Sequence, residues 1–186
     1  MLNVTARQEL MRTIVETLGV VVEEARLDFG EDGLSVRVVD PSHVAMIKMD
    51  VDSAAFETWE VDETKLGLEM RKMHQFLSVA GAGDMVELAY NDESGQATIH
   101  IGRIDLNLRP LDNSTLNPPN VPSLELPCGV TIGGSELAQA LRAAKLVGDL
   151  VNLSLTEDTF TVNVKGSTDS VTVSYTHLTL PTTLTV

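Results

Sequence analysis

The stretch Gly33–Met49 reads GLSVRVVDPSHVAMIKM and contains two strand patterns separated by a short polar loop. Its first half, Leu34–Val39, alternates apolar and polar residues, which is the period-two pattern of a half-buried strand. The preceding run Ala25–Phe29 alternates in the same way, and Glu31-Asp32-Gly33 lies between the two runs as a turn. These residues therefore predict a β-hairpin, and the apolar run Val44–Val51 predicts a further strand.

Outward from this hairpin, three segments carry the apolar spacing of amphipathic helices, and a glycine follows each of them. The expected helices are Val4–Leu18, Thr64–Ala80 and Glu136–Val147, the last with Ser135 as its N-cap. The other expected strands are Ala54–Val61, Met85–Tyr90, Gln96–Ile101, Ile104–Arg109, Val130–Ile132, Leu150–Leu155 and Thr159–Val164. Many strands joined by short turns, with few helices, predict an α+β protein with antiparallel sheets.

The segment Leu111–Pro127, LDNSTLNPPNVPSLELP, holds four prolines in seventeen residues and has no helical or strand period. It is predicted to be an extended linker between two domains. On its two sides, FLSVAGAGDMVEL (76–88) and LRAAKLVGDLVNL (141–153) share a helix end, a Gly-Asp pair and a strand start. Chance is one explanation, because such units are common, but copies on both sides of a linker favour a duplicated domain.

The charge of the chain is strongly acidic: 13 Lys and Arg against 27 Asp and Glu give a formal net charge of -14. Affinity for nucleic acid comes largely from neutralised phosphates, so this balance argues against a simple nucleic-acid binder unless the cations are gathered in one place. Six basic residues within the three expected helices are candidates for such a gathering: Arg7, Arg12, Arg71, Lys72, Arg142 and Lys145. Arg71 and Lys72 can share one helix face, and Arg142 and Lys145 can share another. Ordinary solvated helix faces are the alternative interpretation.

Several classes of site find no support in the sequence. The single cysteine, Cys128, excludes an internal disulfide and a Cys-rich zinc site, and the histidines lack metal-binding spacing. Asp40, Ser42 and His43 lie too close together for a hydrolytic triad, whose members come from distant segments. We expect no catalytic residues, no metal and no cofactor.

No apolar run reaches the length of a membrane helix and no signal peptide is evident, so a soluble intracellular protein is expected.

The ordered set of these motifs resembles the proliferating cell nuclear antigen (PCNA) family of DNA sliding clamps. Within Gly33–Met49, the residues that fit the family's signature are Asp40, Ser42, His43, Val44 and Met46. The other matching parts are the helix–glycine–strand unit Met73–Leu88, the linker end Val121-Pro122-Ser123-Leu124 and the unit Glu136–Leu153. The resemblance covers about residues 1–173 and is closer to archaeal than to animal members.

The resemblance implies the processivity fold of DNA clamps, with antiparallel sheets outside and helices lining a central channel. It implies a complete first clamp domain at 1–110, an interdomain linker at 111–127 and the first half of a second domain at 128–173. A fourth helix and further strands would be expected after residue 173. Residues 174–186 are rich in threonine and contain no acid, which suggests a non-native tail. Full-length members form homotrimers, and the edge strand with Ile104, Leu106 and Leu108 would pair with a neighbouring subunit.

The implied function is to encircle duplex DNA without sequence preference and to tether DNA polymerase and other replication and repair proteins. A clamp performs no chemistry and depends on a separate clamp loader. The six helix cations, Arg12 and Arg142 among them, would meet DNA phosphates in the channel. A partner-peptide pocket would be formed by His43, Val44, Met46, Val121, Pro122, Leu124 and Leu126. Core packing is the alternative role for Val44 and Met46.

Two other functions remain open on the sequence: a checkpoint-type clamp, and a protein-interaction domain without a DNA role. Peptide binding at the pocket would favour the replication clamp, and retention on DNA would exclude the plain interaction domain. The acidity suits a clamp, because an acidic outer surface repels DNA while the helix cations accept it inside the hole. The expected location is the cytoplasm, on the nucleoid, in a prokaryote and the nucleus in a eukaryote, with no membrane association.

Overall fold

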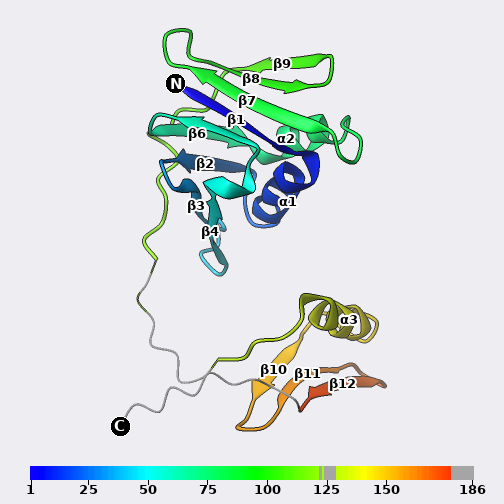
Figure 1. Cartoon of the computed structure of the whole chain (residues 1–186). Helices are drawn as coiled ribbons and strands as arrows, with labels where there is room; N and C mark the ends of the chain where they lie inside the picture. Colours follow the sequence, from blue (N-terminus) through cyan, green and yellow to red (C-terminus); the bar gives the residue numbers. More distant parts are fainter. Residues whose placement is uncertain (122, 124–128, 177–186) are drawn as a thin grey trace. The chain divides into compact units, whose positions relative to one another are not determined.

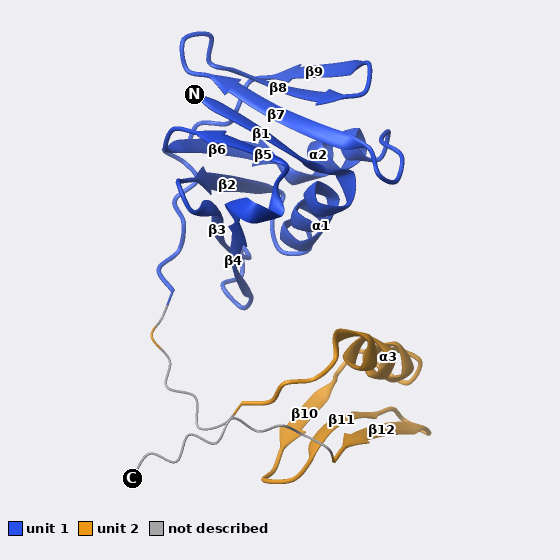
Figure 2. Cartoon of the chain, viewed as in Figure 1, with its two compact units in different colours: residues 1–122 blue, residues 123–186 orange. Residues whose placement is uncertain are grey.

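The computed structural model describes residues 1–121, 123 and 129–176, and the chain forms two compact units, 1–122 and 123–186 (Figures 1 and 2). Unit 1 consists of two antiparallel sheets and two α-helices. One sheet has the strand order β5-β1-β7-β8-β9 and the other the order β4-β3-β2-β6. The elements of unit 1 are β1 (Leu2–Arg7), α1 (Gln8–Gly19), β2 (Glu24–Phe29), β3 (Gly33–Val39), β4 (Met46–Asp52), the 3-10 helix η1 (Ser53–Ala55), β5 (Thr58–Val61), β6 (Thr64–Glu69), α2 (Met70–Leu77), β7 (Met85–Asn91), β8 (Gln96–Ile101) and β9 (Ile104–Leu108).

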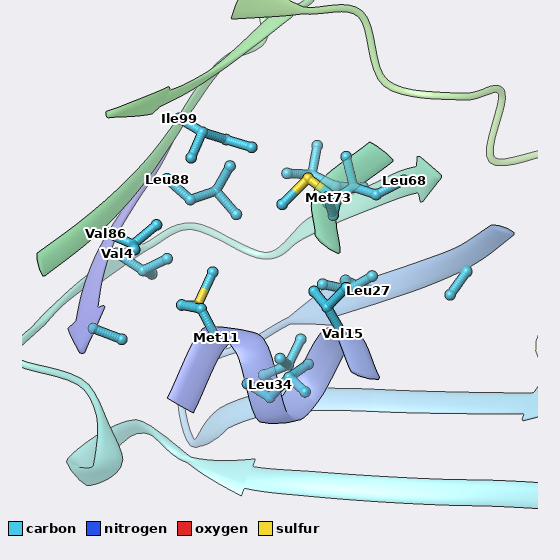
Figure 3. Packing of buried hydrophobic residues seen from close by; sticks show 14 of the residues in the cluster. Val4, Met11, Val15, Leu27, Leu34, Leu68, Met73, Val86, Leu88 and Ile99 are labelled. Atoms are coloured by element: carbon cyan, nitrogen blue, oxygen red, sulfur yellow. The ribbon is translucent and has the colours of Figure 1, made fainter. Parts of the chain in front are cut away.

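A single hydrophobic core joins both sheets and both helices of unit 1. Alternate residues of β1, β2 and β3 are buried, as the period-two patterns predict for strands with one inward face. Figure 3 shows side chains from α1 (Met11), from the first sheet (Leu88) and from the second (Leu27, Leu68) pointing toward one another. Each fully buried leucine contributes about 1.5–3 kcal/mol through its removal from water. This core fixes which faces of α1 and α2 remain exposed.

The first two helix predictions are wrong at their N-terminal ends. Residues 4–7 belong to β1, which pairs with β5 and β7, and α1 begins only at Gln8. Residues 64–69 form β6, which pairs with β2, and α2 begins at Met70. In both places a strand runs directly into a helix. The local apolar spacing favours a helix at these residues, but pairing with distant strands makes them a strand instead. Arg7, expected on a helix, is therefore the last residue of a strand.

Two strand predictions and one cap prediction are also corrected. The expected strand Ala54–Val61 is divided, since η1 and a two-residue connection precede β5. Val130–Ile132 is not a strand, although both residues pack on the core of unit 2. β1, which also precedes a helix, has two partner strands, whereas Val130–Ile132 has none in the described part of the chain. Ser135 does not cap the third helix, whose N-cap is Gly133 without a side-chain bond.

Unit 2 contains a helix and a three-stranded antiparallel sheet. Its elements are α3 (Gly134–Lys145), β10 (Asn152–Leu155), β11 (Phe160–Lys165) and β12 (Ser170–Tyr175). Phe160 stacks on Tyr175 with ring centroids 6.1 Å apart, and the Tyr175 hydroxyl donates to the Glu136 carbonyl at 2.9 Å. The expected tail of residues 174–186 thus begins inside β12, because Ser174 and Tyr175 belong to the sheet; residues 177–186 lie outside the described part of the chain.

A helix followed by three antiparallel strands recurs along the chain. The sets are α1 with β2, β3 and β4, α2 with β7, β8 and β9, and α3 with β10, β11 and β12. The Gly-Asp pairs of the predicted repeat, Gly83-Asp84 and Gly148-Asp149, precede the strands of the second and third sets. The repeating element is therefore smaller than a domain and occurs twice in unit 1.

The start of the predicted linker is tied to unit 1. The Leu111 amide donates to the Gly67 carbonyl at 2.8 Å, and the Asn113 side chain donates to the Lys65 carbonyl at 2.7 Å. A Cβ on Gly67 would lie 2.8 Å from the Leu116 side chain, so only glycine lets the segment run this close to β6. Among the described helices, none is both long and apolar enough to cross a membrane.

Candidate functional site

Arg12 and Arg71 lie on the exposed faces of α1 and α2. The core face of α1 is formed by Met11, Ile14, Val15 and Leu18, which leaves Arg12 outside, with half of its side chain exposed. Its Nε lies 2.6 Å from Oε1 of Glu16, and the same oxygen lies 3.1 Å from Nε2 of His74 on α2. Arg71 is more open, and its Nη2 is 3.9 Å from Glu69. The two helices thus bring Arg12, Glu16 and His74 together, a grouping that helical spacing within one segment cannot predict.

Arg7 and Lys72 point elsewhere. Arg7 Nε lies 3.5 Å from Glu57 Oε1, just before β5. Lys72 lines a hollow of about 70 Å³ with Leu108 and Arg109, whereas Arg71 lines a different hollow of about 400 Å³ with Glu16 and His74. The prediction that Arg71 and Lys72 share a face is therefore wrong, since adjacent helix positions are about 100° apart and here open on different hollows.

Arg142 and Lys145 lie in the last turn of α3, in unit 2, and both are exposed. Ala140 and Ala144 form the buried side of this helix against the sheet. Cations in a last turn are favoured by the partial negative charge of the helix C-terminus, by about 0.3–1 kcal/mol at exposed sites. The small alanines let the helix lie close to its sheet, and the structure shows both basic side chains exposed, with no ion pair to any described residue.

The loop between β3 and β4 presents an apolar surface. Val44 is 86% exposed and Met46 is 37% exposed, and His43 is exposed as well. The alternative that Val44 and Met46 belong to the core is therefore wrong, because the core side of β4 is formed by Ile47, Met49 and Val51. Exposed apolar side chains at one edge of a sheet are suited to docking an apolar side chain of a partner.

Asp40 holds this loop in shape. Its Oδ1 accepts from the backbone amides of Val44 at 2.7 Å and Ala45 at 2.6 Å, and its Oδ2 accepts from the Ser42 amide at 2.9 Å. His43 takes a left-handed conformation, φ 56°, at the tip. The amides of Ala45, Val44 and Ser42 hold the pKa of the Asp40 carboxyl below its usual value. Because its oxygens are occupied by backbone amides, Asp40 orders the loop instead of serving a triad with Ser42 and His43.

The proline-rich segment contributes a wall that the sequence did not indicate. Residues 115–119 line a hollow of about 150 Å³ together with Ala25, Val38 and Val39 of the second sheet. Leu116 is placed there by the close approach at Gly67. Of the linker residues predicted for the pocket, Val121 is 46% exposed, and Pro122, Leu124 and Leu126 lie outside the described residues. The sequence signal for this wall is the run LNPPN, which predicts an extended chain but does not predict that the chain packs beside the second sheet.

The predicted subunit-edge strand is β9, the outermost strand of its sheet. It pairs with β8 on one side, and no described strand pairs with its other side. Ile104 is 44% exposed, while Leu106 and Leu108 are partly buried against the core. Within the ranges that the structure describes, no group of three or more His, Cys, Asp or Glu side chains is arranged to hold a metal ion.

Acid should loosen the loop that Asp40 orders. The folded-state pKa of Asp40 is depressed, so its stabilising bonds are complete above the unfolded value of about 3.9 and are lost as the pH falls through the folded pKa. We expect the amide signals of Val44 and Ala45 to move in NMR spectra over this acid range. Asp40→Asn should remove that titration and speed hydrogen exchange at both amides at neutral pH. Unchanged exchange in the variant would contradict the role of Asp40.

A family model matches the first part of the chain. Residues 1–105 match the model described as proliferating cell nuclear antigen, N-terminal domain. The chain is 34% identical over 172 residues to the DNA polymerase sliding clamp of Methanosarcina barkeri, a match that covers 92% of this chain and 70% of the relative. It is 30% identical to the DNA polymerase sliding clamp of Haloarcula marismortui, over 92% of this chain and 70% of that protein.

Solved structures agree with this family in both units. The structure described as the C-terminal region of FEN-1 bound to A. fulgidus PCNA superposes with a TM-score of 0.91 at 30% identity. That match covers 96% of this chain and 74% of the A. fulgidus protein. PCNA from Thermococcus kodakaraensis superposes with a TM-score of 0.83 at 20% identity, over 95% of this chain and 73% of that one, and shows the same fold. The predicted α+β clamp fold is confirmed.

Proposed function

This chain belongs to the proliferating cell nuclear antigen family of DNA sliding clamps, and we propose that it serves as a subunit of a ring that encircles duplex DNA and tethers DNA polymerase. The observation that carries the proposal is the agreement of the chain, across both units, with a clamp that holds the C-terminal region of another protein. A ring raises processivity by topology, because it slides along the duplex without leaving it. Its own residues need only tolerate DNA and hold partners.

The DNA contacts in this proposal come from the helices. Arg12, Arg71, Arg142 and Lys145 are exposed on helices whose other faces are buried, so that in a ring lined by helices they face the duplex. Contacts to phosphates are independent of sequence and weaken with salt. Arg7 and Lys72 contribute less directly, since Arg7 ends a strand and Lys72 faces the β9 side of its helix. The net charge of -14 leaves other surfaces acidic and repulsive to DNA.

Partner peptides dock, in this proposal, on the surface formed by His43, Val44 and Met46 beside residues 115–121. Val44 and Met46 offer exposed apolar contacts on a loop that Asp40 fixes in advance. The neighbouring hollow at residues 115–119 is bounded by Leu116 and by two prolines, whose rigid backbone loses little entropy on binding. The C-terminal region of FEN-1, bound by the A. fulgidus clamp, is an example of such a partner.

The remaining parts of the proposal follow from the clamp assignment. The protein performs no chemistry, and opening of the ring onto DNA falls to a separate clamp loader. The ring is a homotrimer in which the free edge of β9, with Ile104, Leu106 and Leu108, pairs with a strand of the neighbouring subunit. An exposed strand edge of this kind presents unpaired N–H and C=O groups with which a strand of another chain can pair. The ring acts in the cytoplasm, on the nucleoid.

Met46→Ala tests the docking surface. We expect the change to weaken binding of a synthetic peptide with the C-terminal sequence of FEN-1 by about 1–3 kcal/mol, the scale of a buried apolar anchor. Isothermal titration calorimetry measures it. Met85→Ala is a matched control, because Met85 is 38% exposed against 37% for Met46 but lies at the start of β7 in the other sheet. Equal peptide affinity of the two variants would show that the docking surface is misplaced.

A further inference from the structure

The two helices of unit 1 share an acidic residue among their DNA-facing cations. Glu16 of α1 lies between Arg12, one turn earlier, and His74 of α2, with its Oε1 at 2.6 Å and 3.1 Å from the two side chains. It also lines the hollow of about 400 Å³ that Arg71 borders. About half of each of the three side chains is exposed, so the group lies at the surface where a ligand can reach it.

Glu16 occupies the position beside Arg12 that a DNA phosphate would take. The hydrogen bond from Arg12, and then that from His74, lower the pKa of Glu16, so it is ionised at neutral pH. A guanidinium binds carboxylate and phosphate oxygens through the same N–H groups. Arg12 therefore cannot use its Nε for a phosphate while Glu16 holds it. Lys72, Arg142 and Lys145 differ, because no ion pair joins them to an acid among the described residues.

We propose that Glu16 is an intramolecular competitor of DNA phosphate, which binds Arg12 whenever a phosphate leaves and so weakens the hold of the channel on the duplex. The inference rests on the proposed function. An incoming phosphate exchanges one anion for another at Arg12, so fewer counterions are released than at a free cation. A carboxylate one turn away gives Arg12 a partner between successive phosphates. Glu16 thus keeps DNA contacts short-lived, as sliding requires.

The test is Glu16→Gln, which keeps the shape and removes the charge. We expect the variant to bind a fluorescent duplex more tightly at low salt, measured by anisotropy over a sodium chloride series. The slope of log K against log salt should steepen by about 0.9, which is about three- to fourfold in affinity over a fourfold change in salt. Glu93→Gln, in the β7–β8 turn, removes the same charge away from the helices and should leave the slope unchanged.

Two further variants separate the possible outcomes. If Glu16 acts through Arg12, adding Arg12→Ala to Glu16→Gln should abolish the gain in DNA affinity. Glu16→Ala should show the same gain as Glu16→Gln, even if the glutamine disturbs packing. Trp59 fluorescence confirms that unit 1 is folded in each variant. If the wild type binds DNA and both Glu16 variants behave like Glu93→Gln, the competitor role is wrong and the clamp function stands. If neither the wild type nor any variant binds at low salt, the DNA-binding function itself fails, and the competitor role with it.

Discussion

Alanine at Arg12, Arg71 and Arg142 together should flatten the salt dependence of DNA binding by about 2 units of log–log slope. Arg71 and Arg142 each account for roughly one neutralised phosphate, at about 0.9 of slope for each contact, whereas Arg12 adds little because it exchanges Glu16 for the phosphate. Between about 50 and 200 mM salt, two contacts correspond to a roughly 12-fold change in affinity that the variant would lack. The measurement is anisotropy of a labelled duplex with the wild type and the variant. The fold should survive, since all three side chains are exposed.

The control for this experiment removes three cations from strands and a turn. Lys48, Lys65 and Arg103 are exposed on β4, on β6 and in the β8–β9 turn, so alanine at these positions changes the net charge equally. If charge alone determines DNA affinity, both triple variants will flatten the slope by the same amount. That result would contradict the assignment of the helices as the DNA-facing layer.

The strands were easier to predict than the ends of the helices. Leu34–Val39 and Gln96–Ile101 have one inward face, and the structure confirms both as strands. The N-terminal limits of α1 and α2 failed for a shared reason. Leu2, Val4 and Ala6 are buried in a strand, yet one of them, Val4, also extends the apolar spacing of the helix that follows. Only pairing of β1 with β5 and β7, far along the chain, distinguishes the two conformations.

The candidate site divides in the same way between local and distant determinants. The exposed position of Val44 follows from residues 40–45 themselves, because one carboxylate orders the loop. The contact of His74 with Glu16 joins residues that are 58 positions apart, and no pattern within either helix predicts it. The wall at residues 115–119 depends on the absence of a side chain at Gly67, which the sequence shows only as an ordinary glycine. The sequence therefore predicts which residues belong to the site, whereas the contacts between these residues can be known only from the fold.

Gly33→Ala should destabilise unit 1 by about 2–5 kcal/mol, the sum of a strained backbone and an overpacked contact. Gly33 has φ 149°, and a Cβ at this position would lie 2.1 Å from the Val51 carbonyl oxygen and 2.9 Å from the Ser53 amide nitrogen. Both are backbone atoms, so β4 would have to move away from β3. Urea unfolding followed by Trp59 fluorescence measures the effect, because Trp59 donates to the Gly30 carbonyl in the same turn.

Gly95→Ala separates the two contributions. Gly95 also has a positive φ, 63°, but nothing lies within 4 Å of a Cβ built there, so this variant should lose only about 1–2 kcal/mol. Equal losses at the two positions would mean that β3 and β4 are not as close as described. A larger loss at Gly33 should be accompanied by weaker FEN-1 peptide binding in the folded fraction. Met46 begins β4, so a strand displaced at Asp52 by the new Cβ moves the docking surface at its other end.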